Sequence, residues 1–185
     1  MAKEIEFGKI IGKGKRGIVY AGKFNEKICA IKVKNPKSTA IGRIENESRW
    51  LKIMNKHGIG PRYYCSFDNT LIMEHLEGVH LGKFRGGNAI FKKILLQCRT
   101  MDKLKVNKYE MHKINKNAIV VKNKPVLIDF ERCKIVLEPK NVTQFCQFLI
   151  RKGLCKDKSK AIISMKKYKK NMCDETFTSL VKEFF

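Results

Sequence analysis

Three glycines at a particular spacing are the first residues of this chain that suggest chemistry. Gly12, Gly14 and Gly17 form a G-x-G-x-x-G-x-V string that ends at Val19. A glycine has no Cβ, so the backbone N–H groups of such a loop can approach phosphate oxygens closely. Dinucleotide-binding folds share the first six positions but need a helix after them. Here a β-rich run, Ile18–Phe24, follows, so the string is predicted to form a hairpin over phosphates.

A lysine that needs a partner comes 15 residues after the last of these glycines. Lys32 follows Ala30 and Ile31 at the end of a predicted strand. A lysine between apolar strand residues is costly to bury unless its ammonium group meets an opposite charge. On the next predicted helix Glu47 is the natural candidate, whereas Glu45 lies on a different face. The spacing therefore predicts an ion pair between Lys32 and Glu47.

An acid directly after an apolar strand completes the set. Asp129 follows the run Val126–Ile128 and precedes Phe130 and Glu131. A carboxylate in such a position can ligate a metal ion that is bound to phosphates. The alternative is an aspartate that ends a strand in an ordinary turn.

The elements that must position these residues follow from the spacing of apolar residues. The first 75 residues predict strands on either side of one helix, Ala40–Lys56, in which Ile44, Trp50, Leu51 and Met54 share a face. The predicted strands are Ile5–Ile11, Ile18–Phe24, Lys27–Val33, Tyr63–Phe67 and Thr70–Glu74.

The rest of the chain is predicted to be mainly helical. A helix over Ile90–Leu104 precedes two short strands, Ala118–Val121 and Pro125–Ile128, and helices dominate after Pro139. We therefore expect a single domain over 1–185, with a sheet-rich N-lobe over about 1–76 and a C-lobe over about 77–185.

The ordered set of motifs resembles the protein-kinase-like superfamily over the stretch from about 7 to 148. The glycine string matches the phosphate-covering loop, Ala30-Ile31-Lys32 matches V-A-I-K, and Asp129-Phe130-Glu131 takes the place of D-F-G. The chain is similar to the small atypical serine/threonine kinases, of the RIO and KEOPS types and their archaeal relatives. The resemblance implies an α+β, bilobal kinase-like fold, with an antiparallel sheet and one helix in the N-lobe and a minimal, mainly helical C-lobe.

The resemblance also implies an activity and a set of site residues. The chain would transfer the γ-phosphate of ATP to a serine or threonine hydroxyl of an unknown protein substrate, with Mg²⁺, or alternatively Mn²⁺, as the cation. Lys32 and Glu47 would be catalytic, and Asp129 and Asn117 would bind the metal. The implied nucleotide-binding residues are Gly12, Gly14, Gly17, Val19, Ala30, Lys32, Glu74 and Leu76.

The catalytic loop departs from the kinase pattern because it contains no aspartate. Counting from the preceding helix puts Glu110 at the position of the base, with Asn115 five residues later. Counting back from Ala118–Val121 favours Asn117 as the metal ligand and puts His112 at the base position. We prefer Glu110 with Asn117, and a glutamate misplaced by about 1 Å can slow transfer about a hundredfold. The competing hypothesis is therefore a nucleotide-binding pseudokinase that acts as an RNA- or protein-binding scaffold.

Two further departures concern the segment that follows. Glu131 stands where the kinase motif has glycine, which removes backbone freedom from a segment that usually moves. Only eight residues separate Phe130 from Pro139, and no Ala-Pro-Glu follows. Peptide-binding kinases dock their substrates on this segment, so its brevity argues against ordinary peptide phosphorylation.

Positive charge dominates the composition. The chain has 40 Lys and Arg against 17 Asp and Glu, a net charge of +23, which attracts polyanions. Arg151–Lys170 alone holds nine basic residues and one acid, so we expect a contact with RNA or a ribonucleoprotein there. The alternative is a solvated lysine-rich surface of the kind found in heat-adapted proteins.

The remaining composition places the chain among intracellular proteins. The 7 cysteines occur singly without a CxxC pair, which favours reduced core cysteines over a zinc site or disulfides. The N-terminus lacks an apolar signal region, and no apolar run is long enough to cross a bilayer. We therefore expect a cytoplasmic protein with no membrane contact.

Overall fold

The computed structural model describes residues 4–185, which divide into two compact units. The first consists of the described residues up to Gly78 together with Val126–Cys133, and the second of Val79–Pro125 and Lys134–Phe185. The sequence placed all residues beyond 76 in the C-lobe, whereas the structure packs the segment around Asp129 with the first unit. Phe130 is 1% exposed, and its ring lies against Gly60 of the first unit, where an added Cβ would be 3.0 Å from it.

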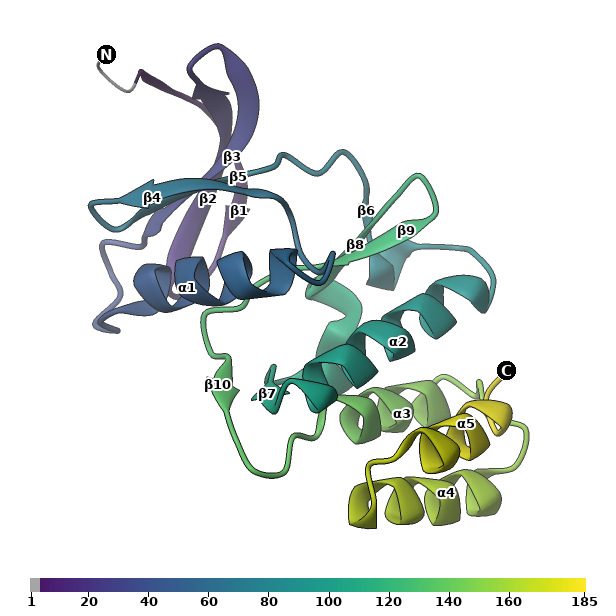
Figure 1. Cartoon of the computed structure of the whole chain (residues 1–185). Coiled ribbons are helices and arrows are strands. Elements are labelled where there is room, and N and C mark those ends of the chain that lie inside the picture. The colour runs from purple at the N-terminus through teal and green to yellow at the C-terminus, as the bar shows by residue number, and fades with distance from the viewer. Residues whose placement is uncertain (1–3) are drawn as a thin grey trace. The chain divides into compact units, whose positions relative to one another are not determined.

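The first unit contains an antiparallel sheet of five strands and one helix (Figure 1). In spatial order the strands are β1 (Ile5–Lys13), β2 (Gly17–Phe24), β3 (Lys27–Lys34), β5 (Thr70–Met73) and β4 (Tyr63–Phe67). The helix α1 (Arg43–Asn55) packs against β3, β4 and β5. The strands predicted from the sequence are confirmed to within two residues at each end.

Strand β3 lies inside the sheet and is buried on both faces. Cys29 and Ile31 pack with Ile72 in an apolar cluster on one face. Successive side chains of a strand point to opposite faces, so Ala30 and Lys32 project from the other face. Both are also buried, which puts the ammonium group of Lys32 where it needs a partner.

Helix α1 begins three residues later than predicted. Gly42 adopts a left-handed conformation, with φ +65°, which a helix cannot continue through. The apolar face expected from the spacing is confirmed, because Ile44, Trp50, Leu51 and Met54 are all buried. Glu47 lies on the same buried face.

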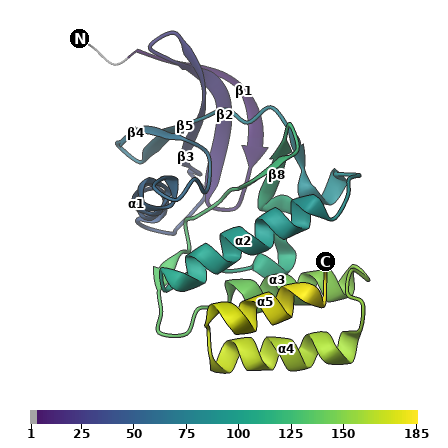
Figure 2. The ribbon, with the colours of Figure 1, turned by 45° about the vertical axis from the view of Figure 1, so that its right-hand side comes forward.

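The second unit is mainly helical, as expected (Figure 2). Helices α2, α3, α4 and α5 follow one another in contact, and Figure 2 shows α4 and α5 side by side. The helices are α2 (Ala89–Lys103), α3 (Asn141–Arg151), α4 (Lys158–Lys170), α5 (Asp174–Lys182) and the short 3₁₀ helices η1 (Leu81–Lys83) and η2 (Met111–Lys116). The strands are β6 (Val79–His80), β7 (Val106–Asn107), β8 (Ala118–Val121), β9 (Lys124–Leu127, which runs into the first unit) and β10 (Lys134–Ile135).

The two-residue strands were not predicted from the spacing of apolar residues. β6 pairs with β8, and β10 pairs with β7, so each is defined by its partner and not by its own sequence. A segment this short shows no periodicity that could identify it. Strand β9 is the third strand of the β6-β8-β9 sheet.

A buried polar network joins α2, α3 and β7 at the centre of the second unit. The amide of Asn141 donates to Asp102 Oδ1 at 2.7 Å and to the carbonyl of Val106 at 2.6 Å. Its Oδ1 accepts from the backbone N–H of Lys108 at 2.7 Å. Tyr168 of α4 donates its hydroxyl to Asp102 Oδ2 at 3.0 Å. One fully buried asparagine thus satisfies three groups on two other segments.

Most of the basic residues lie at the surface. Lys158, Lys160, Lys166 and Lys167 of α4 are exposed, whereas its Ala161 and Tyr168 are buried. Four of the seven cysteines are buried, namely Cys29, Cys98, Cys133 and Cys146. None of the helices formed by residues 4–185 combines the length and apolar character that crossing a membrane would need.

Replacing Asn141 by alanine is predicted to destabilise the protein by about 2 to 3 kcal/mol, because its side chain makes three buried hydrogen bonds that alanine cannot replace. The free energy of unfolding in urea measures this. Gln147→Ala, on the exposed side of the same helix, is the control and should change stability by less than about 0.5 kcal/mol. Equal losses in the two variants would show that the network does not stabilise the second unit.

Candidate functional site

The predicted ion pair between Lys32 and Glu47 is present in the first unit. Lys32 Nζ lies 2.5 Å from Glu47 Oε2, and both side chains are buried. The same nitrogen lies 3.3 Å from Asp129 Oδ1 and 3.9 Å from Glu131 Oε2. Lys32 is therefore the common counter-charge of three carboxylates that come from α1 and from the Asp129-Phe130-Glu131 segment.

Helix α1 also holds that segment by its backbone. Glu47 uses its second oxygen to accept the backbone N–H of Phe130 at 3.3 Å. The amide of Asn46 donates to the carbonyls of Glu131 at 2.8 Å and Cys133 at 3.2 Å. The sequence did not predict this role of Asn46, and only its position next to Glu47 could have indicated it. The helix thus positions the acidic segment directly.

The clustered carboxylates explain the electrostatics of the site. Burial by itself lowers the pKa of Lys32, but the attraction of Glu47, Asp129 and Glu131 outweighs it, and the pKa is raised. Burial raises the pKa of Glu47, and so does repulsion from Asp129 and Glu131. Lys32 therefore keeps its charge, while the carboxylates repel one another and favour a further cation.

Those carboxylates have the chemistry of a hard-cation site. One oxygen each from Glu47, Asp129 and Glu131 lies within 4.8 Å of the others. Mg²⁺ and Mn²⁺ prefer such oxygen ligands. Asp129, whose side chain is 41% exposed, adopts a left-handed backbone with φ +66°. A non-glycine residue in this region often marks a functional position.

The glycine hairpin is a defined turn that packs on Lys32. Gly14 donates its N–H to the carbonyl of Gly17 at 2.9 Å, and Asn35 donates its side-chain amide to the carbonyl of Gly14 at 2.8 Å. A Cβ at Gly17 would lie 2.9 Å from Lys32 Cε. A side chain at Gly17 would thus displace Lys32, whereas a Cβ at Gly12 would make only ordinary contacts.

An ion pair that the sequence did not predict joins this hairpin to the acidic segment. Arg16 Nη1 lies 2.8 Å from Glu131 Oε1. The glutamate that replaces the glycine of the kinase motif therefore has a partner in the glycine hairpin. In the sequence Arg16 is one of 40 basic residues, and 115 positions separate it from Glu131, so no local pattern indicated the pair.

The other residues assigned to the nucleotide lie in the same unit. Val19 of β2 is paired in register with Lys32 and with Gly12, and Ala30 is paired with Met73. Glu74 donates its N–H to the carbonyl of Arg62 at 2.8 Å and accepts the N–H of Arg62 on its side chain at 3.0 Å. Leu76 is half-buried two residues later.

The predicted catalytic loop belongs to the second unit. Glu110 has a left-handed backbone, with φ +69°, and precedes η2, whose Met111 and Ile114 are fully buried. The backbone N–H of Met111 donates to Gln144 of α3 at 3.2 Å. The two buried side chains and this hydrogen bond anchor the loop, so Glu110 occupies a fixed, exposed place on it.

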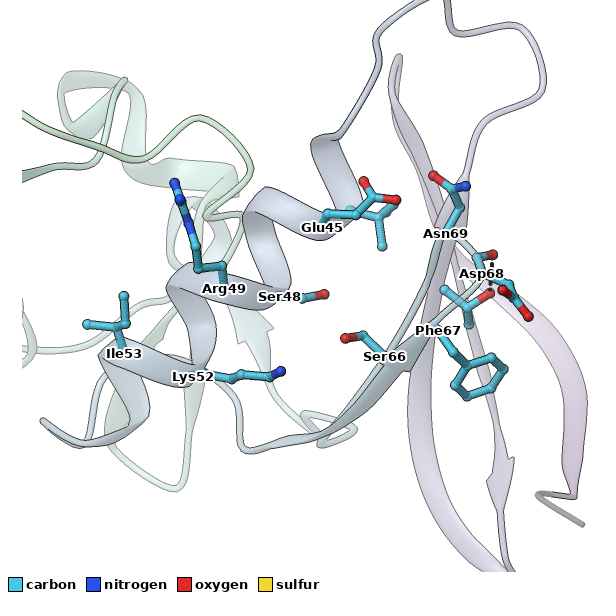
Figure 3. Close-up of a pocket in the computed structure, with 11 residues that line it drawn as sticks. Glu45, Ser48, Arg49, Lys52, Ile53, Ser66, Phe67, Asp68 and Asn69 are labelled. Carbon is cyan, nitrogen blue, oxygen red and sulfur yellow. Dashed lines mark hydrogen bonds between the residues drawn. The ribbon is translucent and has the colours of Figure 1, made fainter.

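A pocket on the outer side of α1 was not predicted from the sequence (Figure 3). It has a volume of about 420 Å³ between α1 and the β4–β5 hairpin. Figure 3 shows Ser48 and Lys52 pointing from the helix toward the strand that carries Ser66. Because Ser48 is adjacent to Glu47, this pocket lies on the helix that holds the ion pair.

We predict that Lys32→Met lowers the free energy of unfolding by about 3 kcal/mol, because three carboxylates lose their buried counter-charge. Arg16→Gln is the comparison, and its side chain is 32% exposed. Its loss should stay below about 1 kcal/mol. Urea denaturation of both variants checks the difference, and equal losses would contradict the burial argument.

No protein-family model matches the chain. Ethanolamine kinase 2 from Rattus norvegicus and from Mus musculus are each 45% identical to it over 38 residues, which is 20% of this chain. The match spans about a tenth of the length of these curated relatives, 10% in each case.

A solved structure matches almost the whole chain. The crystal structure of the Rio2 kinase-ADP/Mg²⁺-phosphoaspartate complex from Chaetomium thermophilum superposes with a TM-score of 0.64 at 11% identity, covering 96% of this chain and 70% of that one. At this identity the likeness establishes the fold alone. The chain therefore has a mixed α/β, protein-kinase-like fold similar to that of the Rio2 kinase, which confirms the fold class predicted from the sequence.

Proposed function

We propose that this chain is an ATP-dependent phosphotransferase, a minimal atypical kinase that transfers the γ-phosphate to a hydroxyl group. The observation that carries the proposal is the buried Lys32–Glu47 pair with Asp129 3.3 Å from the same ammonium group. A pseudokinase scaffold would not need to keep a lysine, a glutamate and an aspartate in this arrangement. The likeness of the fold to the Rio2 kinase supports the same proposal.

Each residue of the site has a role in this proposal. Lys32 holds the phosphates of ATP under the glycine hairpin, and Glu47 keeps the ammonium group oriented. Asp129, with Asn117 from the catalytic loop, binds Mg²⁺ or Mn²⁺, and Glu131 offers a further carboxylate oxygen. When bound, the cation neutralises charge on the transferred phosphoryl group. Ala30, Val19, Glu74 and Leu76 surround the nucleoside.

Glu110 accepts the proton of the attacking hydroxyl in this mechanism. The hydroxyl oxygen forms a bond to the γ-phosphorus as the bond to the ADP oxygen breaks. We keep His112 as the alternative base. We prefer Asn117 to Asn115 as the metal ligand because Asn115 lines a pocket with four cationic side chains, where another cation is disfavoured.

The first test separates metal binding from proton transfer. Asp129→Asn should lower the transfer of ³²P from ATP by at least about a hundredfold and weaken magnesium-dependent nucleotide binding. Glu110→Gln should lower the transfer rate by about a hundredfold while nucleotide binding stays unchanged. Lys23→Gln, which changes an exposed residue of β2, is the control. If wild type transfers no more phosphate than Asp129→Asn, the protein is not a phosphotransferase.

A second candidate concerns the acceptor, and the match to ethanolamine kinase 2 favours it. The acceptor would be a small alcohol instead of a protein side chain. The segment between Phe130 and Pro139 supports this candidate, because it contains only the two-residue strand β10 and offers little length for docking a peptide.

Small alcohols and proteins can be compared as acceptors directly. With ³²P-labelled ATP, a mixture of amino alcohols and sugar alcohols should yield a labelled small product at a rate at least about tenfold above that for casein or for the chain itself. The Asp129→Asn variant serves as the inactive control with each class of acceptor. Faster labelling of protein would return the assignment to a serine/threonine kinase.

A further inference from the structure

A basic pocket in the second unit lies between η2 and the last turn of α3. It has a volume of about 570 Å³, within the range of small-ligand sites. No acidic residue is among the described residues that line it. The lining consists of His112, Lys113, Asn115, Lys116, Phe148, Arg151 and Lys152.

Four full positive charges meet in this pocket, and the helix alone does not explain them. Arg151 and Lys152 follow the usual preference for cations at a helix C-terminus. Lys113 and Lys116 belong to another element, so the dipole of α3 gives no reason for them. Backbone N–H groups of Gly153 and Leu154 already cap the last carbonyls of α3. An anion is the ligand that would relieve the repulsion among these side chains.

A buried acceptor atom points to a second feature of the ligand. Asn115 Oδ1 is buried and has no hydrogen-bond partner. An unsatisfied buried acceptor costs about 1 to 3 kcal/mol. Asn115 is packed against Gly82, because a Cβ added at Gly82 would lie 3.0 Å from the Cβ of Asn115. This contact holds the asparagine side chain in place. A ligand hydroxyl could donate the missing hydrogen bond.

Contacts of Arg151 and Phe148 join the two walls of the pocket and cover its aromatic ring. Arg151 donates to the backbone carbonyl of His112, which ties α3 to η2 with one of its five N–H donors. Phe148 is buried, stacks on Phe145 with ring centroids 5.7 Å apart and carries Lys152 Nζ 5.9 Å from its ring centre. Because Phe148 is covered in this way, no aromatic face is left in the pocket for stacking a base.

We propose that this pocket binds the phosphate group of a small phosphorylated alcohol, whose hydroxyl interacts with Asn115. Because η2 is part of the predicted catalytic loop, the bound molecule is the acceptor of the phosphoryl group, a step that rests on the proposed function. Binding of the phosphate group to this pocket does not depend on the proposed function. The four cations select a phosphate, and the absence of an open aromatic face favours a small molecule over RNA.

Calorimetric titration of the full chain with inorganic phosphate tests the pocket without nucleotide. Lys113→Gln/Lys116→Gln should weaken phosphate binding by about tenfold or more, since two charge-assisted hydrogen bonds are removed. Lys166→Gln/Lys167→Gln on α4 removes the same charge from exposed lysines and should change the affinity by less than about twofold. All four lysines are exposed, so the variants should fold normally. Equal weakening by the two pairs would overturn the proposal.

Two further titrations identify the ligand. Glycerol 3-phosphate should bind wild type more tightly than inorganic phosphate, and Asn115→Ala should abolish the difference; no difference in wild type would overturn the role of the hydroxyl. A single-stranded RNA that displaces phosphate from wild type but not from Lys113→Gln/Lys116→Gln would identify the site as an RNA site and overturn the small ligand. If wild type binds phosphate but transfers no phosphoryl group from ATP, the proposed function is contradicted and the proposed phosphate pocket is supported.

Discussion

The burial of Lys32 among carboxylates is the interaction on which the first unit depends. An ammonium group in the middle of a five-stranded sheet destabilises the fold unless an opposite charge reaches it. Glu47 can reach it only if α1 packs on β3, and Asp129 only if its segment leaves the second half of the chain to join the first unit. Asn46 and Glu47 hold that segment by its backbone. The ion pair and the position of the segment therefore depend on each other.

The distribution of charge has a functional meaning that the net charge conceals. A chain of net charge +23 places three carboxylates against one lysine and one arginine, which leaves this site with a local negative excess. In the proposed function, a divalent cation that holds phosphates compensates this excess. The pocket beside η2 has the opposite character, with four cations and no acid among the residues of 4–185 that line it. Our two proposals therefore assign ligands of opposite charge to the two units.

Local sequence patterns predicted much of the fold and part of the site. Alternation of apolar residues located the five strands of the sheet, and helical spacing located α1 and the buried face that carries Glu47. The two-residue strands β6, β7 and β10 could not be predicted, because strands this short are defined only by pairing with distant partners. The importance of Asn141 could not be predicted either, because its hydrogen-bond partners Asp102, Val106 and Lys108 are remote in the sequence.

The sequence by itself determined the order of strands and helices and the pairing of Lys32 with Glu47, because periodicity and an unfavourable buried charge are read from residues close together in the chain, and the resemblance of its ordered motifs indicated the kinase-like fold class. Tertiary structure alone decided which of the 40 basic residues have particular partners. Arg16 pairs with Glu131 across 115 positions, and Lys113 and Lys116 share a pocket with Arg151 and Lys152. Identical side chains differ in function only through their surroundings, and those surroundings are assembled by packing between segments that are remote in the chain.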